Sequence, residues 1–330
     1  MFPLTRCSRW LLSRQPQVIS AAGSVRGPRK LSGSAVAMAP IERVTVIGSG
    51  LMGSGIAQVA AQTGHGVQLV DVSQDVLSVA SKRIESSLAR VAKKKFAEDP
   101  QAGVDFVKTT LGRIQFTVDA VEAAKSCDLV IEAIVENVGV KQKLFSELDK
   151  AAPSSTIFTS NTSSLSITEI ASSTDRRDRF GGLHFFNPVP VMKLLEVIRI
   201  DETSDATFDA LMKFGKAMKK TTVSCKDTPG FIVNRLLVPY LAEAVRLLER
   251  GEASAQDIDT AMKLGAGHPM GPFELLDYVG LDTTKFILEG WSERFPDNPL
   301  FKPTEHVNQL VEAGKIGMKS GEGFYSYKKS

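Results

Sequence analysis

Short apolar runs and longer amphipathic stretches alternate along the chain from residue 41 to residue 226. The short runs are rich in β-branched residues, as buried parallel strands are, and they fall at residues 44–47, 67–70, 113–116, 128–133, 156–159, 180–186, 194–198 and 221–224. The longer stretches repeat apolar residues every three or four positions, which predicts helices, and they fall at residues 56–61, 74–97, 119–124, 137–151 and 204–218. This alternation indicates an α/β fold built on a doubly wound parallel sheet.

Two departures from the alternation complete the predicted architecture. After the helix at residues 74–97, a second helical segment at residues 106–111 predicts a helical arm that a plain crossover does not need. Beyond residue 226 the apolar residues keep helical spacing, in segments at residues 231–250, 255–264, 272–279, 282–289 and 304–313, with Pro239 as a kink. Only residues 323–326 are strand-like there. We therefore predict a sheet domain over residues 41–226 and a mainly α-helical domain over residues 227–330.

A glycine motif follows the first predicted strand. The strand leads directly into Gly48-Ser49-Gly50-Leu51-Met52-Gly53, whose G-x-G-x-x-G spacing permits a tight turn and a helix packed close on the strand. The free N–H groups of such a helix end bind a pyrophosphate. Asp71 closes the next strand, about 20 residues past the glycines, where a carboxylate binds a ribose 2′-hydroxyl. The motif predicts a Rossmann-like dinucleotide site, and Asp71 favours NAD because it would repel the 2′-phosphate of NADP.

Composition separates the first forty residues from the rest of the 330-residue chain. They hold six basic residues, several serines and no acid before Glu42, which is typical of a transit peptide, with a basic surface tail as the alternative. Removing six positive charges from a net charge of +3 leaves about −3, so no nucleic-acid partner is expected. No apolar run is long enough to span a membrane, and three scattered cysteines form neither a disulfide framework nor a metal site. We expect residues 1–40 to be a mitochondrial transit peptide and the mature protein to reside in the matrix.

His184 has the surroundings that suit proton transfer. It lies on a predicted strand whose end should face the cofactor crevice, and Glu196 lies on the following strand, which could pair back beside it. A carboxylate bonded to an imidazole fixes the tautomer and stabilises the charged form, as a base that accepts an alcohol proton requires. A structural histidine is the alternative.

Polar residues near the ends of other elements are candidates for binding a substrate. Asn161 and Ser163 follow the strand at residues 156–159 and could hold a substrate oxygen, although turn formation or helix capping is the plainer role. Asn234 interrupts an apolar helical stretch and needs a polar partner if it is buried. The run Lys93-Lys94-Lys95 is either a solvated helix end or a basic arm for a phosphorylated substrate.

Four motifs resemble the mitochondrial short-chain L-3-hydroxyacyl-CoA dehydrogenases. They are the glycine motif, Ser160-Asn-Thr-Ser-Ser164, His184-Phe-Phe-Asn-Pro188 and Asp227-Thr-Pro-Gly-Phe-Ile-Val-Asn-Arg235, of which the last two are specific. The resemblance covers nearly everything after residue 40. It implies an NAD-dependent enzyme, a homodimer through its helical domain, that oxidises L-3-hydroxyacyl-CoA to 3-ketoacyl-CoA in the penultimate, oxidative step of fatty-acid β-oxidation.

The same resemblance implies roles for individual residues. His184 would be the general base, Glu196 would orient it, and Ser163 and Asn234 would hydrogen-bond the substrate oxygen. The implied NAD contacts beyond the glycine motif are Asp71, Glu136, Lys141, Ser163, Asn187 and Lys319, and the implied coenzyme A contacts are Ser87, Lys94 and Ser163. The site would then form between the two domains, and substrate binding should close them.

Two other functions fit part of the sequence. A 3-hydroxyisobutyrate or 6-phosphogluconate type dehydrogenase shares the glycine motif and a helical second domain, but those families use a catalytic lysine. A catalytically idle relative retained as a structural protein, as some lens crystallins are, would be expected to have a damaged His–Glu pair and no leader. The intact pair and the basic leader favour the hydroxyacyl-CoA dehydrogenase.

Overall fold

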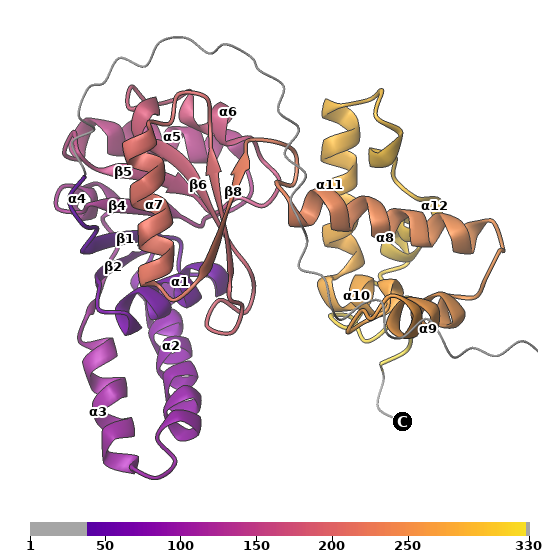
Figure 1. The fold of residues 1–330 in the computed structure, drawn as a ribbon, viewed down its shortest axis with the longest axis horizontal. Coiled ribbons are helices and arrows are strands. Elements are labelled where there is room, and N and C mark those ends of the chain that lie inside the picture. Colours follow the sequence, from indigo (N-terminus) through magenta and orange to yellow (C-terminus); the bar gives the residue numbers. More distant parts are fainter. Residues whose placement is uncertain (1–37, 328–330) are drawn as a thin grey trace, which may run out of the picture. The chain divides into compact units, whose positions relative to one another are not determined.

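A computed structural model describes residues 38–327, so the predicted leader lies almost wholly outside the described residues. One eight-stranded sheet has the order β3-β2-β1-β4-β5-β6-β7-β8 (Figure 1). Its strands are β1 (Arg43–Ile47), β2 (Gly66–Val70), β3 (Ile114–Thr117), β4 (Leu129–Glu132), β5 (Ile157–Ser160), β6 (Phe180–Phe185), β7 (Leu194–Arg199) and β8 (Thr221–Lys226). The order reverses direction between β1 and β4, and the carboxyl ends of strands at such a reversal form the usual ligand crevice. The predicted doubly wound α/β fold is confirmed.

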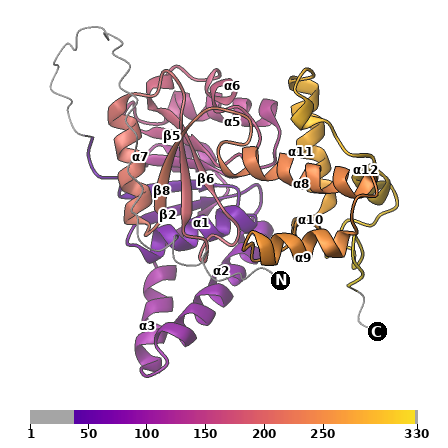
Figure 2. The same ribbon diagram turned by 45° about the vertical axis from the view of Figure 1, so that its right-hand side comes forward.

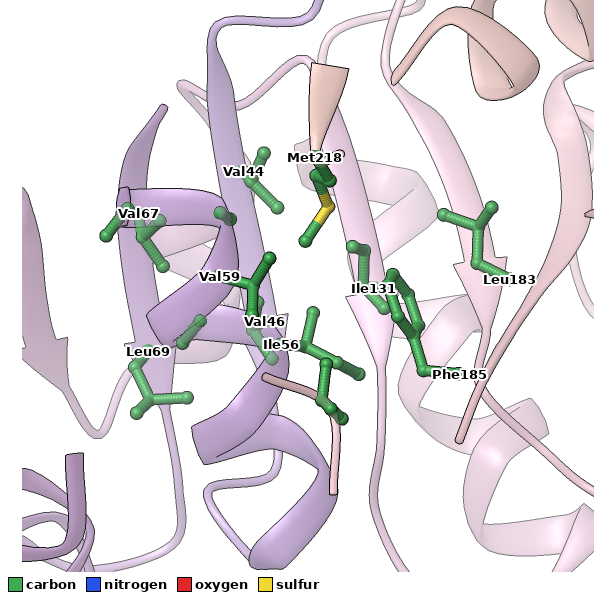
Figure 3. Close-up of a cluster of buried hydrophobic side chains, with 14 of the residues drawn as sticks. Val44, Val46, Ile56, Val59, Val67, Leu69, Ile131, Leu183, Phe185 and Met218 are labelled. Atoms are coloured by element: carbon green, nitrogen blue, oxygen red, sulfur yellow. The ribbon is translucent and has the colours of Figure 1, made fainter. Parts of the chain in front are cut away.

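Helices pack on both faces of the sheet. One face carries α1 (Leu51–Gln62), α2 (Gln74–Lys95), α3 (Pro100–Leu111) and α7 (Asp205–Ala217), and the other carries α4 (Ala120–Ala124), α5 (Val138–Ala151) and α6 (Ile167–Ala171). Successive side chains of a strand alternate between faces, so Val44 and Val46 join the core under α1 while Ile47 joins the opposite one. Figure 3 shows Val46 against Ile56 and Val59 of α1 in that core.

One pair of strands departs from the parallel arrangement. β6 and β7 are antiparallel, and their register sets His184 directly opposite Glu196. β8 then pairs with β7 in parallel. The expectation that the strand carrying Glu196 pairs back beside His184 is confirmed.

The predicted helical arm is present and its second helix is longer than expected. α3 begins at Pro100 rather than near residue 106, because the Asp99 side chain caps it by accepting from the N–H of Ala102 and proline suits the first helical position. α2 and α3 lie side by side as a hairpin in both views (Figures 1 and 2). The lysine run of residues 93–95 closes α2 at the outer end of this hairpin.

Past β8 the chain is helical. The helices are α8 (Val233–Glu249), α9 (Ala255–Gly265), α10 (Pro272–Val279), α11 (Leu281–Arg294) and α12 (Glu305–Glu312), with short 3-10 turns at Pro299–Phe301 and, in the sheet domain, at Arg177–Arg179. These helices have apolar cores of their own. Within residues 38–327, no helix is both long enough and apolar enough to cross a bilayer.

The strand predicted at residues 323–326 is wrong. This segment makes only isolated bridges, Gly317 with Glu322 and Glu322 with Ser326. The backbone N–H groups of Phe324 and Tyr325 donate instead to the carboxylate of Asp277, each at 2.9 Å. A buried side chain therefore takes the hydrogen bonds that a partner strand would have taken.

Candidate active site

The three glycines of the motif have different surroundings. A Cβ atom on Gly48, whose φ is +98°, would lie 2.4 Å from the carbonyl oxygen of Ala133, and one on Gly53 would lie 1.7 Å from that of Gly48. A Cβ on Gly50 would meet nothing within 4 Å. No side chain caps the first turn of α1 behind this space, so its N–H groups are free to bind an anion. The outer glycines are needed for packing, whereas Gly50 leaves room for a pyrophosphate, and the loop fits a dinucleotide.

Asp71 lies where the motif predicts an acid. Its Oδ2 accepts hydrogen bonds from the backbone N–H and the hydroxyl of Ser49 at 2.6 and 2.7 Å, and its Oδ1 accepts from the N–H of Val72 at 2.7 Å. Burial would raise the pKa of Asp71, but these donors outweigh it and lower the pKa below its ordinary value. A carboxylate that stays charged beside the glycine loop suits ribose hydroxyls and repels an additional phosphate.

His184 and Glu196 form a buried pair on adjoining strands. Nδ1 of His184 lies 2.6 Å from Oε2 of Glu196, and Nε2 of the same ring lies 3.1 Å from Oγ of Ser163. The rings of Phe186 and Phe231 pack against the imidazole. When Nδ1–H donates to the carboxylate, Nε2 keeps a lone pair and can accept a proton. The arrangement therefore suits a general base with an orienting carboxylate.

Glu196 also connects the sheet domain with the helical domain. Its second oxygen, Oε1, accepts hydrogen bonds from the backbone N–H groups of Ile232 and Val233 at 3.1 and 2.9 Å, so it faces the positive end of α8. The amide of Asn234 donates to the carbonyl oxygen of Ser163 at 3.5 Å. The structure thus brings the predicted catalytic residues together from four separate segments.

Glu136 accepts several hydrogen bonds from the loop that carries Ser163. Its Oε1 accepts from the hydroxyl of Thr162 and from the backbone N–H groups of Ser163 and Ser164 at 3.0 and 3.3 Å. Burial would raise the pKa of Glu136, but Lys141 and these loop donors together lower it. The ionised carboxylate holds the loop, and with it the Ser163 hydroxyl that contacts the imidazole.

Lys141 lies between two carboxylates and is 1% exposed. Its Nζ is 2.5 Å from Oε1 of Glu132 and 3.1 Å from Oε2 of Glu136. Glu132 also accepts from the hydroxyl of Ser160 and the N–H of Ile134; burial, the largest influence, raises the pKa of Glu132. Our sequence reasoning missed Glu132, although an acid that ends a wholly apolar strand needs a partner and was an available signal.

The remaining predicted residues lie away from this cluster. Asn187 is exposed on the turn after β6. Lys319 lies in the C-terminal segment, where its ammonium contacts Asp282 at 2.9 Å and Thr283 at 3.1 Å on α11. Ser87 is partly buried and Lys94 exposed, and both are on α2 of the arm. In this structure none of these four has a hydrogen bond to the His184 cluster.

Two family models match consecutive parts of the chain. Residues 43–228 match the one described as 3-hydroxyacyl-CoA dehydrogenase, NAD binding domain, and residues 230–327 match the one described as 3-hydroxyacyl-CoA dehydrogenase, C-terminal domain. Together they span nearly all of the described residues.

Relatives and a solved structure show the same similarity over most of the chain. The mitochondrial hydroxyacyl-coenzyme A dehydrogenase of Mus musculus is 65% identical over 288 residues, which is 87% of this chain and 92% of that protein. The Homo sapiens protein of the same name is 63% identical over 305 residues, covering 91% of this chain and 97% of its own. The crystal structure of (S)-3-hydroxybutyryl-CoA dehydrogenase from Ralstonia eutropha superposes with a TM-score of 0.82 at 40% identity, covering 88% of this chain and 100% of that one.

Proposed function

Because the chain belongs to the 3-hydroxyacyl-CoA dehydrogenase family, we propose that it oxidises L-3-hydroxyacyl-CoA to 3-ketoacyl-CoA in fatty-acid β-oxidation, with NAD as its cofactor. The observation that carries the proposal is the buried His184–Glu196 pair, whose free imidazole nitrogen faces Ser163. The pair stands near the carboxyl ends of the strands, where ligands of such sheets bind.

The residues of the His184 cluster divide the reaction between them. Nε2 of His184 takes the proton of the 3-hydroxyl group, and Glu196 stabilises the imidazolium that results. Ser163 and Asn234 hydrogen-bond the substrate oxygen and hold C3 in place. When bound, NAD supplies the hydride acceptor for the hydrogen on C3. The proton leaves through His184 and the hydride leaves with the cofactor, so the alcohol becomes a ketone.

NAD would be held mainly by the sheet domain. We assign the pyrophosphate to the open space at Gly50 and the ribose hydroxyls to Asp71, supported by the geometry of the glycine loop. The further proposed contacts are Glu136, Lys141, Ser163, Asn187 and Lys319. For Lys141, whose ammonium is already shared by two carboxylates, the contribution would come largely through fixing Glu136.

Coenzyme A would lie along the arm. Ser87 and Lys94 are seven residues apart on α2 and so share one face of that helix. Their proposed partners are the polar and charged groups of coenzyme A, with Ser163 at the acyl end. Within the lysine run, this assignment favours the basic-arm interpretation for Lys94.

The domains and their motion are part of the proposal. We place the boundary between residues 226 and 227, supported by the change from strands to helices after β8. Since Asn234 and the first amides of α8 already reach Ser163 and Glu196, substrate binding would complete closure around this contact.

The same family membership supports proposals for the assembly and the location of the protein. We propose a homodimer through the helical domain, which exposes large apolar side chains such as Leu264, Tyr278 and Phe286. Size-exclusion chromatography with light scattering should give twice the chain mass. The close relatives carry mitochondrial names, so the protein is placed in mitochondria and the matrix is the finer proposal. A reporter fused to residues 1–40 should enter that compartment, and a cytosolic distribution would contradict the matrix assignment.

Two alternatives have specific weaknesses. A 3-hydroxyisobutyrate type enzyme would use a catalytic lysine, whereas Lys141, the buried lysine of the cluster, is paired with Glu132 and Glu136. An idle structural relative would not be expected to keep His184, Glu196 and Ser163 within hydrogen-bonding distance.

A direct assay tests the proposed function. Protein, NADH and acetoacetyl-CoA are mixed and NADH absorbance is followed; we expect it to fall with saturable kinetics. A folded preparation that binds NADH and consumes none would refute the proposed activity.

A further inference from the structure

The basic residues of α2 have different surroundings, and Arg90 is exposed between the two proposed coenzyme A contacts of that helix. On the basis of the proposed function, we infer that Arg90 is a further binding residue for the phosphates of coenzyme A, between Ser87 and Lys94. Arg90 would contact the substrate on the arm and take no part in the chemistry at His184.

Helix geometry sets Arg90 on the proposed coenzyme A face. An α-helix turns about 100° per residue, so residues 83, 87, 90 and 94 of α2 form one stripe. Its inner end is fixed in the structure, because Nη1 of Arg83 donates to the carbonyl oxygen of Ser49 at 3.2 Å. The stripe therefore starts at the glycine loop and runs outward along the arm, with Arg90 and Lys94 beyond Ser87.

The neighbouring cations are engaged elsewhere. Lys93 lines an apolar groove of about 620 Å³ between α2 and α3, together with Ala89 and Val104. Nζ of Lys95 lies over the rings of Phe96 and Phe106, 5.0 and 5.3 Å from their centroids. These two lysines thus point away from the stripe. The run of three lysines contributes one cation, Lys94, to the proposed coenzyme A face.

Arg90 and Lys94 are both exposed, and neither forms an ion pair with any residue of the described part of the chain. They are separated by about 6 Å along the helix axis, at 1.5 Å per residue. Coenzyme A carries a ribose phosphate monoester and a diphosphate a few bonds apart, so two cations at this separation can bind different phosphates of one molecule. The planar guanidinium of Arg90 suits bidentate binding to phosphate oxygens, while Lys94 acts as a point charge.

Truncated substrates test the inference. Acetoacetyl-CoA is compared with acetoacetyl-pantetheine, which has the same reacting thioester but lacks the phosphorylated nucleotide. For Arg90→Gln we expect KM for acetoacetyl-CoA to rise by about fivefold, with less dependence on salt, because an exposed charge-assisted contact is lost. KM for acetoacetyl-pantetheine and kcat for both thioesters should stay unchanged.

Lys93→Gln is the matched control. It removes the same charge from a helix position three residues away, but from the groove side, so it should leave KM for both thioesters at the wild-type value. Lys94→Gln should behave as Arg90→Gln does. A wild-type KM in Arg90→Gln, or an equal rise for both thioesters, would overturn the inference.

A binding measurement separates this inference from the proposed function. Calorimetric titration of the unchanged chain and Arg90→Gln with free coenzyme A needs no turnover. Weaker binding in the variant supports the inference even if the chain reduces no thioester, which would refute only the proposed reaction. Equal binding by both proteins overturns the inference whatever their activity.

Discussion

The glycine loop and the His184 cluster are built in opposite ways, although most of their residues lie in the sheet domain. The loop consists of consecutive residues. Of its two constrained glycines, Gly53 packs against the carbonyl of Gly48 within the motif, and Gly48 packs against the carbonyl of Ala133 at the end of the neighbouring strand β4. The cluster takes His184 from β6, Glu196 from β7, Ser163 from the loop after β5 and Asn234 from α8. Local geometry suffices for holding a phosphate, since backbone N–H groups do the binding. Proton transfer needs particular side chains at hydrogen-bond distance, and these come from several elements.

Charge distribution separates the two regions further. The loop offers partial positive charge from uncapped N–H groups. Around the cluster, Glu196, Glu132 and Glu136 are three buried or partly buried carboxylates, held by α8 amides, Lys141 and loop hydroxyls. Such networks are stable only while every member is satisfied. We therefore expect substitutions in the cluster to have effects that depend on charge, whereas those in the loop should depend on space.

His184→Gln should have the largest effect. Loss of a general base lowers kcat by about 10²- to 10⁴-fold, while NADH affinity should stay close to that of the wild type because the imidazole is not a proposed dinucleotide contact. Steady-state kinetics and NADH fluorescence titration measure the two quantities. His268→Gln, which changes an exposed histidine beside Tyr240, is the control with unchanged kcat. Wild-type turnover in His184→Gln would remove its role as base.

Lys141→Met should have the second largest effect, a loss of folding stability. The variant leaves Glu132 and Glu136 without their shared cation, and an uncompensated buried charge costs about 3–5 kcal/mol. Combining it with Glu132→Gln should recover part of that loss, because one buried charge is removed. Urea unfolding gives both values, and exposed Lys143→Met on the same helix is the control. Additive losses in the double variant would mean that the two residues are not energetically coupled.

Gly53→Ala and Gly50→Ala should separate packing from binding in the loop. A methyl group at residue 53 overlaps the Gly48 carbonyl and should cost about 3 kcal/mol of folding stability. At residue 50 the space is open, so stability should change by less than about 1 kcal/mol while NADH binds more weakly. Thermal unfolding of both variants measures the change in stability, and NADH titration measures the change in affinity. Equal stability of the two variants would argue against the close helix–strand packing.

Glu136 should show the smallest effect, and it depends on pH. Its folded-state pKa is lowered, so its stabilisation is fully present above the unfolded value of about 4.3 and is lost as pH falls through the folded value. Glu136→Gln should therefore be less stable than the wild type by about 1 kcal/mol at neutral pH, and the gap should close in acid. Urea unfolding across this range measures it, with exposed Glu147→Gln as control. If the stability difference between the wild type and Glu136→Gln widened on acidification, the pKa of Glu136 would have to be raised in the folded state and not lowered.

Much of the fold could be read from the sequence, and the errors have physical causes. Apolar runs located the central strands of the sheet because burial on both faces leaves few polar positions. The edge strand β8 is exposed or half-buried, and its β-branched residues located it instead. α3 was predicted too short because the cap at Asp99 and the proline after it were not used. The strand prediction for residues 323–326 was wrong because Asp277, whose carboxylate accepts the hydrogen bonds of this segment, lies far away in the sequence. A propensity carries no information about such a long-range hydrogen bond.

The candidate site could be predicted only in part, because some of its contacts join residues that only the packed fold brings together. His184 and Glu196 could be paired from strand order, since an antiparallel return places their residues opposite each other. Glu132 could not be linked with Lys141, nine residues later, until the strand and the helix were packed together. The lysine run was ambiguous as a sequence, and the structure separates Lys93 and Lys95 from Lys94 by the direction in which each leaves the helix.

The sequence by itself determined the features that depend on neighbouring residues. These are the glycine turn with its strand and helix, the acid that follows, the change to helices after residue 226 and the basic, acid-free composition of the first forty residues. Tertiary structure alone decided which further groups the buried carboxylates hold. Glu196 bridges His184 and the start of α8, and Glu136 holds the Ser163 loop. Hydrogen bonds act only over about 3 Å, and only the packed fold brings residues that are distant in the sequence within that range.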